Sequence, residues 1–250
     1  MGSELRVIAR LDIKNEHVIK GIHLEGLRKV GNPLDMAMDY YMQGIDELLF
    51  LDSVASLYNR NNIFSVIRAA SEKVFVPITI GGGLRKLSDV EEALDSGADK
   101  VAINTSAIQN PAFIEEIATK YGSQCVVASI QAKHTQNGWE AYTESGREKT
   151  DILVETWCKQ LQDLGAGELL ITSIDKDGTK LGFDVELMEM VNNSVTIPVL
   201  ASGGFGKLEH IDALYEKTNL SGLCFASALH YKNIEIKNIK EHIKNKYEQH

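Results

Sequence analysis

Cysteine is scarce in this sequence, and its few copies form no pattern. Cys125, Cys158 and Cys224 are an odd, scattered set without a CxxC pair. Neither a disulfide framework nor a zinc site is therefore predicted, and we expect no metal and no cofactor. Cys125 and Cys224 lie within apolar runs, which indicates buried thiols of the kind that a reducing cytoplasm keeps unoxidised.

Long apolar runs and an excess of positive charge are missing as well. No run is long enough to cross a bilayer, and the N-terminus lacks an apolar signal region, so we expect a cytoplasmic protein without membrane contact. The formal net charge of −9 argues against a nucleic-acid partner, which would need a basic surface. A local basic pocket for a phosphorylated small molecule stays compatible with this charge. What is present, 250 residues of which 44% are hydrophobic, suffices for a large core.

Two glycine-rich turns stand out, and they are copies of each other. Val76–Gly83 matches Ile197–Gly204, so Gly204 follows Gly83 by 121 residues. Glu168 follows Glu47 by the same interval, each at the start of a Glu-Leu-Leu run. In both copies an apolar run leads through glycines into a polar, helix-like segment, an arrangement that presents backbone N–H groups to an anion. The sequence therefore predicts two similar halves, each with a phosphate-binding turn.

Short apolar runs alternate with segments of helical spacing along the whole chain, which predicts a parallel sheet. The expected strands are 6–12, 47–52, 76–80, 100–103, 124–131, 168–173, 197–202 and 222–226; the expected helices are 34–44, 62–73, 87–96, 112–121, 152–164, 185–192, 207–217 and 236–249. Eight such units in 250 residues indicate an α/β fold, a single (β/α)8 TIM barrel over residues 1–250, with half-barrels at roughly 1–122 and 123–250. The segment before Pro33 is interpreted as a long polar loop and possible lid, and residues 134–149 as a hairpin on a second long loop.

Polar residues close several of the expected strands, where a (β/α)8 barrel carries its chemistry. Asp12 and Gln131 close the first and fifth strands, and Asp177 lies just beyond the sixth. The residues expected at the two phosphate sites are Gly83, Asn104 and Thr105 in the first half and Gly204, Ala226 and Ser227 in the second. Two such sites on opposite sides of one mouth predict an elongated substrate with a phosphate at each end.

Several short runs occur in order between residues 6 and 230: Leu11-Asp12-Ile13-Lys14, Val18-Ile19-Lys20-Gly21, residues 44–48, Gly81-Gly82-Gly83, residues 97–105, residues 165–170, residues 172–179 and Ala201-Ser202-Gly203-Gly204. In these runs and their order the chain resembles the cyclase subunit of imidazole glycerol phosphate synthase, a family of histidine biosynthesis. The resemblance implies a barrel that takes ammonia from a separate glutaminase subunit docked on its N-terminal face. It also implies a bis-phosphorylated ribulosyl-formimino ribotide as substrate, Lys20 as a site residue of the first loop, and imidazole glycerol phosphate and an aminoimidazole carboxamide ribotide as products.

The family admits ammonia through a ring of alternating charges at the bottom of the barrel. The matching residues are Arg6, Glu47, Lys100 and Glu168, and each opens an expected strand. Two cations and two anions can neutralise one another in a half-buried ring. The resemblance implies a retained ammonia gate; the alternative is a ring of salt bridges that only stabilises the barrel.

Two residues depart from the family pattern. The family uses an aspartate pair as general acid and base, and Gln131 stands at the second of these positions, where an amide cannot exchange a proton in the useful pH range. Arg10 replaces a small uncharged residue two places before Asp12, so both side chains should point into the barrel and pair. Such a guanidinium would also narrow the central passage.

Four interpretations follow from these departures. The first resembles a paralogous branch of the family that works with a glutaminase-like subunit and a separate sugar amidotransferase, converting an acetamido to an acetamidino sugar of surface glycans. The second is an authentic cyclase in which Asp12 serves alone or with Asp177. The third is a non-catalytic partner that activates a glutaminase. An unrelated phosphosugar isomerase is the fourth, but it does not explain the four-charge ring.

Overall fold

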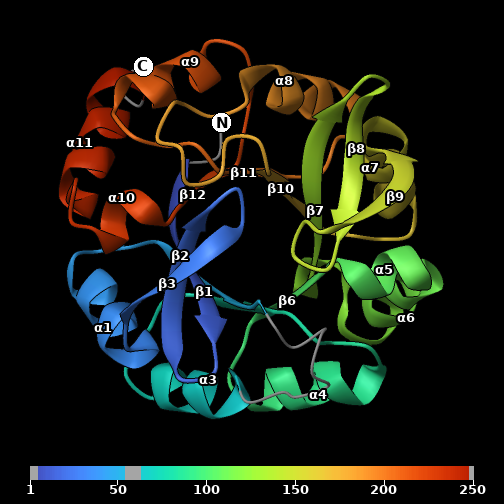
Figure 1. The fold of residues 1–250 in the computed structure, drawn as a ribbon. Helices are drawn as coiled ribbons and strands as arrows, with labels where there is room; N and C mark the ends of the chain where they lie inside the picture. The colour runs from blue at the N-terminus through green and yellow to red at the C-terminus, as the bar shows by residue number, and fades with distance from the viewer. Residues whose placement is uncertain (1–4, 54–62, 248–250) are drawn as a thin grey trace.

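The structure is a computed structural model, and it describes residues 5–53 and 63–247. Its centre is a closed barrel of eight parallel strands (Figure 1). In barrel order these are β1 (Arg6–Lys14), β4 (Glu47–Asp52), β5 (Ile78–Gly81), β6 (Lys100–Ile103), β7 (Val126–Thr135), β10 (Glu168–Ser173), β11 (Val199–Ser202) and β12 (Gly222–Phe225). Pairing of β10 with β7 and of β12 with β1 closes the ring. The predicted (β/α)8 barrel is confirmed.

Helices surround this barrel (Figure 1). They are α1 (Pro33–Met42), α3 (Ile63–Ser71), α4 (Leu87–Asp95), α5 (Thr105–Gln109), α6 (Ala112–Tyr121), α7 (Val154–Asp163), α8 (Val185–Ser194), α9 (Glu209–Tyr215), α10 (Ser227–His230) and α11 (Ile236–Tyr247), with a 3₁₀ turn at Ser123–Cys125. Their apolar sides pack on the outward-facing residues of the strands, such as Val7, Ala9 and Leu11 of β1, to form the main core. Residues 248 and 249 of the predicted last helix, and residue 62 of the predicted helix 62–73, lie outside the described residues.

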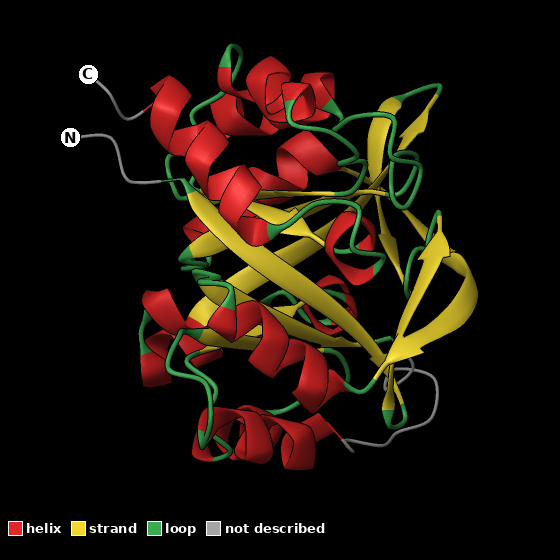
Figure 2. Cartoon of the chain, turned by 90° about the vertical axis from the view of Figure 1, so that its left-hand side faces the viewer, coloured by secondary structure: helices red, strands yellow, loops and turns green. Residues whose placement is uncertain are grey.

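Two antiparallel hairpins extend the barrel on one side (Figure 2). In the first half, β2 (His17–Ile22) and β3 (Glu25–Gly31) follow β1, so the predicted polar loop before Pro33 was wrong. His23 and Leu24 make its tight turn with φ of 53° and 61°, a conformation usually marked by Asn or Gly, and that signal is missing from the sequence. In the second half, β8 (Gly138–Thr143) and β9 (Glu148–Leu153) follow β7, which confirms the predicted hairpin.

The two halves of the barrel correspond element by element, as the 121-residue repeat predicts. Each half runs through a long strand, a hairpin and three further strands of six, four and four residues. Asn104 before α5 and Ala226 before α10 even share an unusual backbone conformation, with φ and ψ of −124° and −85° against −131° and −86°. The short helices α5 and α10, which the sequence interpretation missed, therefore occupy equivalent places after the fourth strand of each half.

An ion cluster ties the last helix, α11, to α9. Asp212 of α9 accepts hydrogen bonds from Lys246 and Tyr247 of α11, and its Oδ1 lies 2.7 Å from Nε2 of His242. Burial alone would raise the pKa of Asp212, but the bonds from Lys246, Tyr247 and His242 lower it to about 2.

Because the pKa of Asp212 is lower in the folded than in the unfolded chain, the ionised carboxylate stabilises the fold at pH values above the ordinary aspartate pKa. This contribution is lost as the pH falls toward about 2. We therefore expect Asp212→Asn to lower the melting temperature at pH 6 and to flatten its decline between about pH 4 and pH 2. Thermal melts of both proteins across this range test this. An unchanged acid slope in the variant would show that Asp212 does not contribute.

Candidate functional site

The inward-facing residues of β1 alternate down the barrel and set its interior layers. Arg6, Ile8, Arg10 and Asp12 point inward, while the residues between them pack on helices. From the N-terminal end upward, the interior holds a charged layer, an apolar layer and a polar mouth. Arg10 and Asp12 thus share one face, as predicted.

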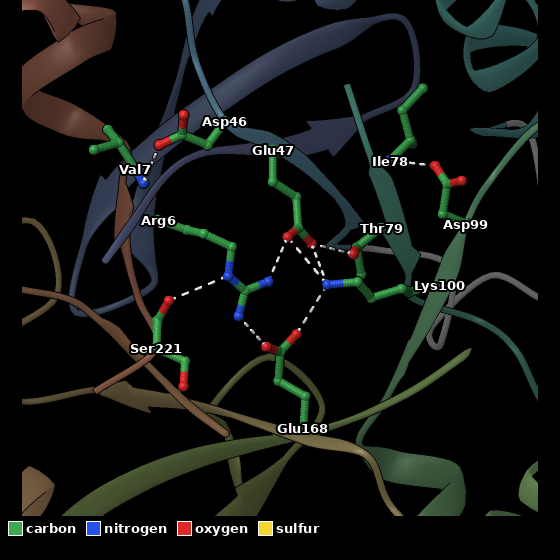
Figure 3. Close-up of polar contacts among 10 residues, drawn as sticks. All are labelled: Arg6, Val7, Asp46, Glu47, Ile78, Thr79, Asp99, Lys100, Glu168 and Ser221. Atoms are coloured by element: carbon green, nitrogen blue, oxygen red, sulfur yellow. Dashed lines mark hydrogen bonds and ion pairs between the residues drawn. The ribbon is translucent and has the colours of Figure 1, made fainter. Parts of the chain in front are cut away.

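The lowest layer is a closed ring of four charged side chains (Figure 3). Arg6 donates to Glu47 Oε2 at 2.8 Å and also bonds Glu168. Lys100 Nζ lies 2.9 Å from Glu47 Oε1 and 3.1 Å from Glu168 Oε2. Each cation therefore bridges both carboxylates. Because all four residues sit at the first position of a barrel strand, they meet at one end of the axis. The structure brings together all four predicted gate residues.

Above the ring lies a small apolar layer that is separate from the outer core. Its members are Ile8, Leu49, Ala102, Val127, Leu170, Leu200 and Cys224. Burial raises the pKa of the Cys224 thiol to about 12, so this thiol is neutral at physiological pH. A charged species would pay a large desolvation cost in this layer, whereas a small neutral molecule would not.

Arg10 and Asp12 form a buried ion pair where the apolar layer meets the mouth. Arg10 Nε donates to Asp12 Oδ1 at 3.0 Å, and Arg10 Nη1 donates to Thr172 Oγ1 at 2.9 Å and Ser202 Oγ at 3.0 Å. Burial would raise the pKa of Asp12, but the positive charges of Arg10 and Lys20 outweigh it and lower the pKa. Asp12 is therefore held as a carboxylate, as the sequence predicts.

Gln131 lies in the same mouth, at the end of the barrel portion of β7. It lines the main hollow together with Arg10 and Asp12. Its Oε1 atom is buried and has no hydrogen-bond partner among the described residues. The chain thus places a neutral amide, and not a second proton carrier, across from Asp12.

The remaining predicted mouth residues divide between two neighbouring hollows. The first is lined by the first glycine turn and the residues after β6, among them Gly83, Asn104 and Thr105. The second is lined by Asp177, Gly204, Ala226 and Ser227. Lys20 lines both. The glycine in each turn is required: a Cβ on Gly82 would lie 2.2 Å from Asp52 O, and one on Gly204 would lie 2.0 Å from Gly182 O.

Lys20 is buried against Asp177, between the two hollows. Lys20 Nζ lies 2.6 and 2.8 Å from the two carboxylate oxygens, and both side chains are almost fully buried. Lys20 is part of β2 and not of a loop. The backbone N–H of His23 also donates to Asp177 O at 2.8 Å, so the first hairpin is fixed to the loop after β10.

This pair predicts a strong effect of removing its cation. Lys20→Met leaves the buried Asp177 without its ion-pair partner, and we expect a loss of about 3 kcal/mol of unfolding free energy and a melting temperature roughly 9 °C lower. Lys159→Met, which breaks an exposed pair with Glu155, is the matched control and should change stability by less than about 0.5 kcal/mol. Equal melting temperatures for the two variants would contradict this assignment.

Several mouth residues were missed by sequence reasoning. Arg85 and Arg147 line the first hollow beside the glycine turn and add positive charge there. Gly146, which adopts a φ of 81°, was an available sequence signal for the turn that precedes Arg147. His230 of α10, which lines neither hollow, was missed as well; it stacks on Tyr40, and its Nδ1 lies 2.7 Å from the Tyr40 hydroxyl. Burial lowers the pKa of His230 to about 4, so the ring is neutral. No cluster of metal-ligating side chains occurs within residues 5–53 and 63–247.

Fold and mouth together define the class: a (β/α)8 barrel of two matching halves, with paired glycine turns around a polar mouth and a charged ring at the opposite end. The family model for histidine biosynthesis proteins matches residues 6–235. The chain belongs to this family, and within it to the HisF family.

Three relatives bear the name imidazole glycerol phosphate synthase subunit HisF. The protein of Legionella pneumophila is 56% identical over 84% of this chain and all of its own length. The proteins of Hydrogenobaculum sp. and Streptococcus mutans are 44% and 45% identical, each over 96% of this chain and at least 95% of their own. No described helix of the present chain is long and apolar enough to cross a membrane.

Proposed function

We propose that this chain is the ammonia-accepting synthase subunit of a glutamine-dependent amidotransferase complex and that it carries out the cyclase reaction of its relatives poorly. The observation that carries this proposal is the mouth itself. Gln131 stands opposite Asp12, and Arg10 is bonded to that aspartate, above a complete four-charge ring. General acid–base assistance contributes roughly 10²–10⁴ to a rate, and of the two aspartate positions that the resemblance assigns to this role only Asp12 keeps a carboxylate, which is held ionised.

The partner is a glutaminase subunit that docks on the N-terminal face, in the cytoplasm. Support comes from the ring at that face and from two apolar side chains near it. Met42 ends α1 and Phe75 precedes β5, and they are 77% and 78% exposed. Exposed large apolar groups at this end of the barrel would be covered by a subunit that docks there. Ammonia released by the partner would enter at the ring and move toward the mouth.

In this proposal the barrel mouth binds a phosphorylated small molecule. The ammonia is used to convert an acetamido sugar of a surface glycan to an acetamidino sugar, a reaction performed with a separate amidotransferase. This assignment rests on the altered proton-transfer pair and on the resemblance to the paralogous branch. Two residues near the first glycine turn, Arg85 and Arg147, fit a phosphorylated ligand.

The second candidate is an authentic cyclase that makes imidazole glycerol phosphate and an aminoimidazole carboxamide ribotide. The names of the relatives favour it over sugar amidation. In this candidate, Asp12 would serve alone or together with Asp177. Asp177 is already engaged by Lys20, so the hairpin would have to release it.

Deletion of the gene in its source strain separates the two candidates. The proposal expects a strain that still grows without histidine and whose surface polysaccharide lacks acetamidino groups by mass spectrometry and NMR. Histidine auxotrophy with unchanged polysaccharide would overturn it in favour of the cyclase. A non-catalytic activating partner is tested separately by calorimetry with ribose 5-phosphate, because a pure scaffold needs no phosphate affinity.

A further inference from the structure

Arg10 spans the barrel interior and does not line its wall. It leaves β1 and reaches Ser202 on β11 and Thr172 on β10. Around the closed barrel, β10 lies three strands from β1, and the strand directly opposite is four away. The guanidinium must therefore cross the region of the barrel axis to make these bonds.

The guanidinium is held firmly in that position. Three hydrogen bonds from Nε and Nη1 fix it to acceptors on three different strands, and only 3% of the residue is exposed. Asp12 neutralises its charge, which makes its burial tolerable. Bonds of charged groups to several rigid acceptors leave little freedom for the side chain to swing.

The layer below and the space above differ in character. Directly beneath lies the apolar layer of Ile8, Leu170, Leu200 and Cys224, and beneath that the charged ring. Above, Arg10 itself lines the main mouth hollow with Asp12 and Gln131. Arg10 therefore lies on the boundary between the axis of the barrel and the mouth.

We infer that Arg10 is an upper gate that closes the axial passage at the mouth and that its side chain must leave Thr172 and Ser202 before ammonia can pass. This inference rests on the proposed function in one respect, that ammonia is the molecule moving along the axis. The four-charge ring and Arg10 then lie below and above the apolar layer, of which Ala102 and Cys224 also border the mouth hollows.

Cys224 provides a reporter, since it belongs to the apolar layer, is 3% exposed and also borders the second mouth hollow. The test is the rate at which methyl methanethiosulfonate modifies Cys224 in the full chain, followed by peptide mass spectrometry. In the Arg10→Ala variant, Cys224 should be modified at least about 10-fold faster than in the wild type, because the guanidinium no longer blocks access to the thiol. Arg10 lowers the pKa of Cys224, against the larger effect of burial, so its loss should slow the intrinsic reaction. A faster rate therefore reports access.

Cys158, buried in α7, is the control for general loosening and should react at the same rate in every variant. Thr172→Val is the second variant, since it keeps the shape of the side chain and removes one bond to Arg10; it should give a smaller acceleration at Cys224. Wild-type rates at Cys224 in both variants would overturn the inference. The readout needs no turnover, so failure of the proposed function would leave this result unaffected, and failure of the gate would leave the function unaffected.

Discussion

A chain carrying both Gln131→Asp and Arg10→Cys is expected to form imidazole glycerol phosphate from the ribulosyl-formimino ribotide and ammonium salt at least ~10²-fold faster than wild type. The first change supplies a second carboxylate across from Asp12 in the mouth hollow. The second removes the Arg10 guanidinium, which donates a hydrogen bond to Asp12 and keeps Asp12 ionised by lowering its pKa. With both changes, one carboxyl group can give a proton while the other takes one.

The matched control carries Gln131→Asn together with Arg10→Cys. Its asparagine has nearly the size of the aspartate and its interior is opened in the same way, but it gains no carboxyl group. Its rate should stay near that of wild type. Ammonium salt bypasses the glutaminase, so the comparison reports only the mouth. If the Asn and Asp variants were equally fast, then access past Arg10, and not proton transfer, would limit the reaction.

Removal of one carboxylate from the four-charge ring is expected to produce the largest loss of stability. Glu47 accepts hydrogen bonds from Arg6, Lys100 and Thr79, and its side chain is 2% exposed. Glu47→Ala leaves two cations facing each other with one carboxylate between them. Because Arg6 is partly exposed and solvent screens it, we expect a loss of about 4 kcal/mol and not the upper limit for a buried pair.

Urea unfolding at neutral pH measures this loss directly, as a lower midpoint with an unchanged slope. Glu91→Ala is the control, because Glu91 makes an exposed ion pair with Lys120 at 3.5 Å and should change stability by less than about 1 kcal/mol. Equal urea midpoints for Glu47→Ala and Glu91→Ala would contradict this prediction, because they would show that the ring does not stabilise the fold.

The fold was predictable because its signals are local and repeated. The strands at 47–52, 100–103 and 168–173 were predicted with the bounds that the structure has, since each is a short apolar run that begins with a charged residue. The 121-residue interval supplied independent support, because it aligned both the glycine turns and the two ring glutamates. The first hairpin was missed because its turn, at His23 and Leu24, adopts left-handed backbone without a glycine or asparagine to announce it.

The sequence predicted which residues lie in the site, but not which hydrogen bonds and ion pairs they form with one another. Alternation along one strand was enough to place Arg10 and Asp12 side by side. Thr172 and Ser202 follow Arg10 by 162 and 192 residues, and no sequence pattern shows that a guanidinium reaches them across the barrel. The Lys20–Asp177 pair joins residues 157 positions apart and depends on the hairpin that the sequence interpretation lacked.

The central claim is that the barrel retains the architecture for ammonia but little of the cyclase chemistry. The most direct test is a single-turnover measurement of imidazole glycerol phosphate formation by the wild-type chain with saturating ammonium salt, run in parallel with the Streptococcus mutans subunit, which is 45% identical. We predict a rate at least ~10²-fold below that of the relative, in keeping with one missing proton carrier. A rate equal to that of the relative would contradict the claim and make this chain a cyclase that works without a second aspartate.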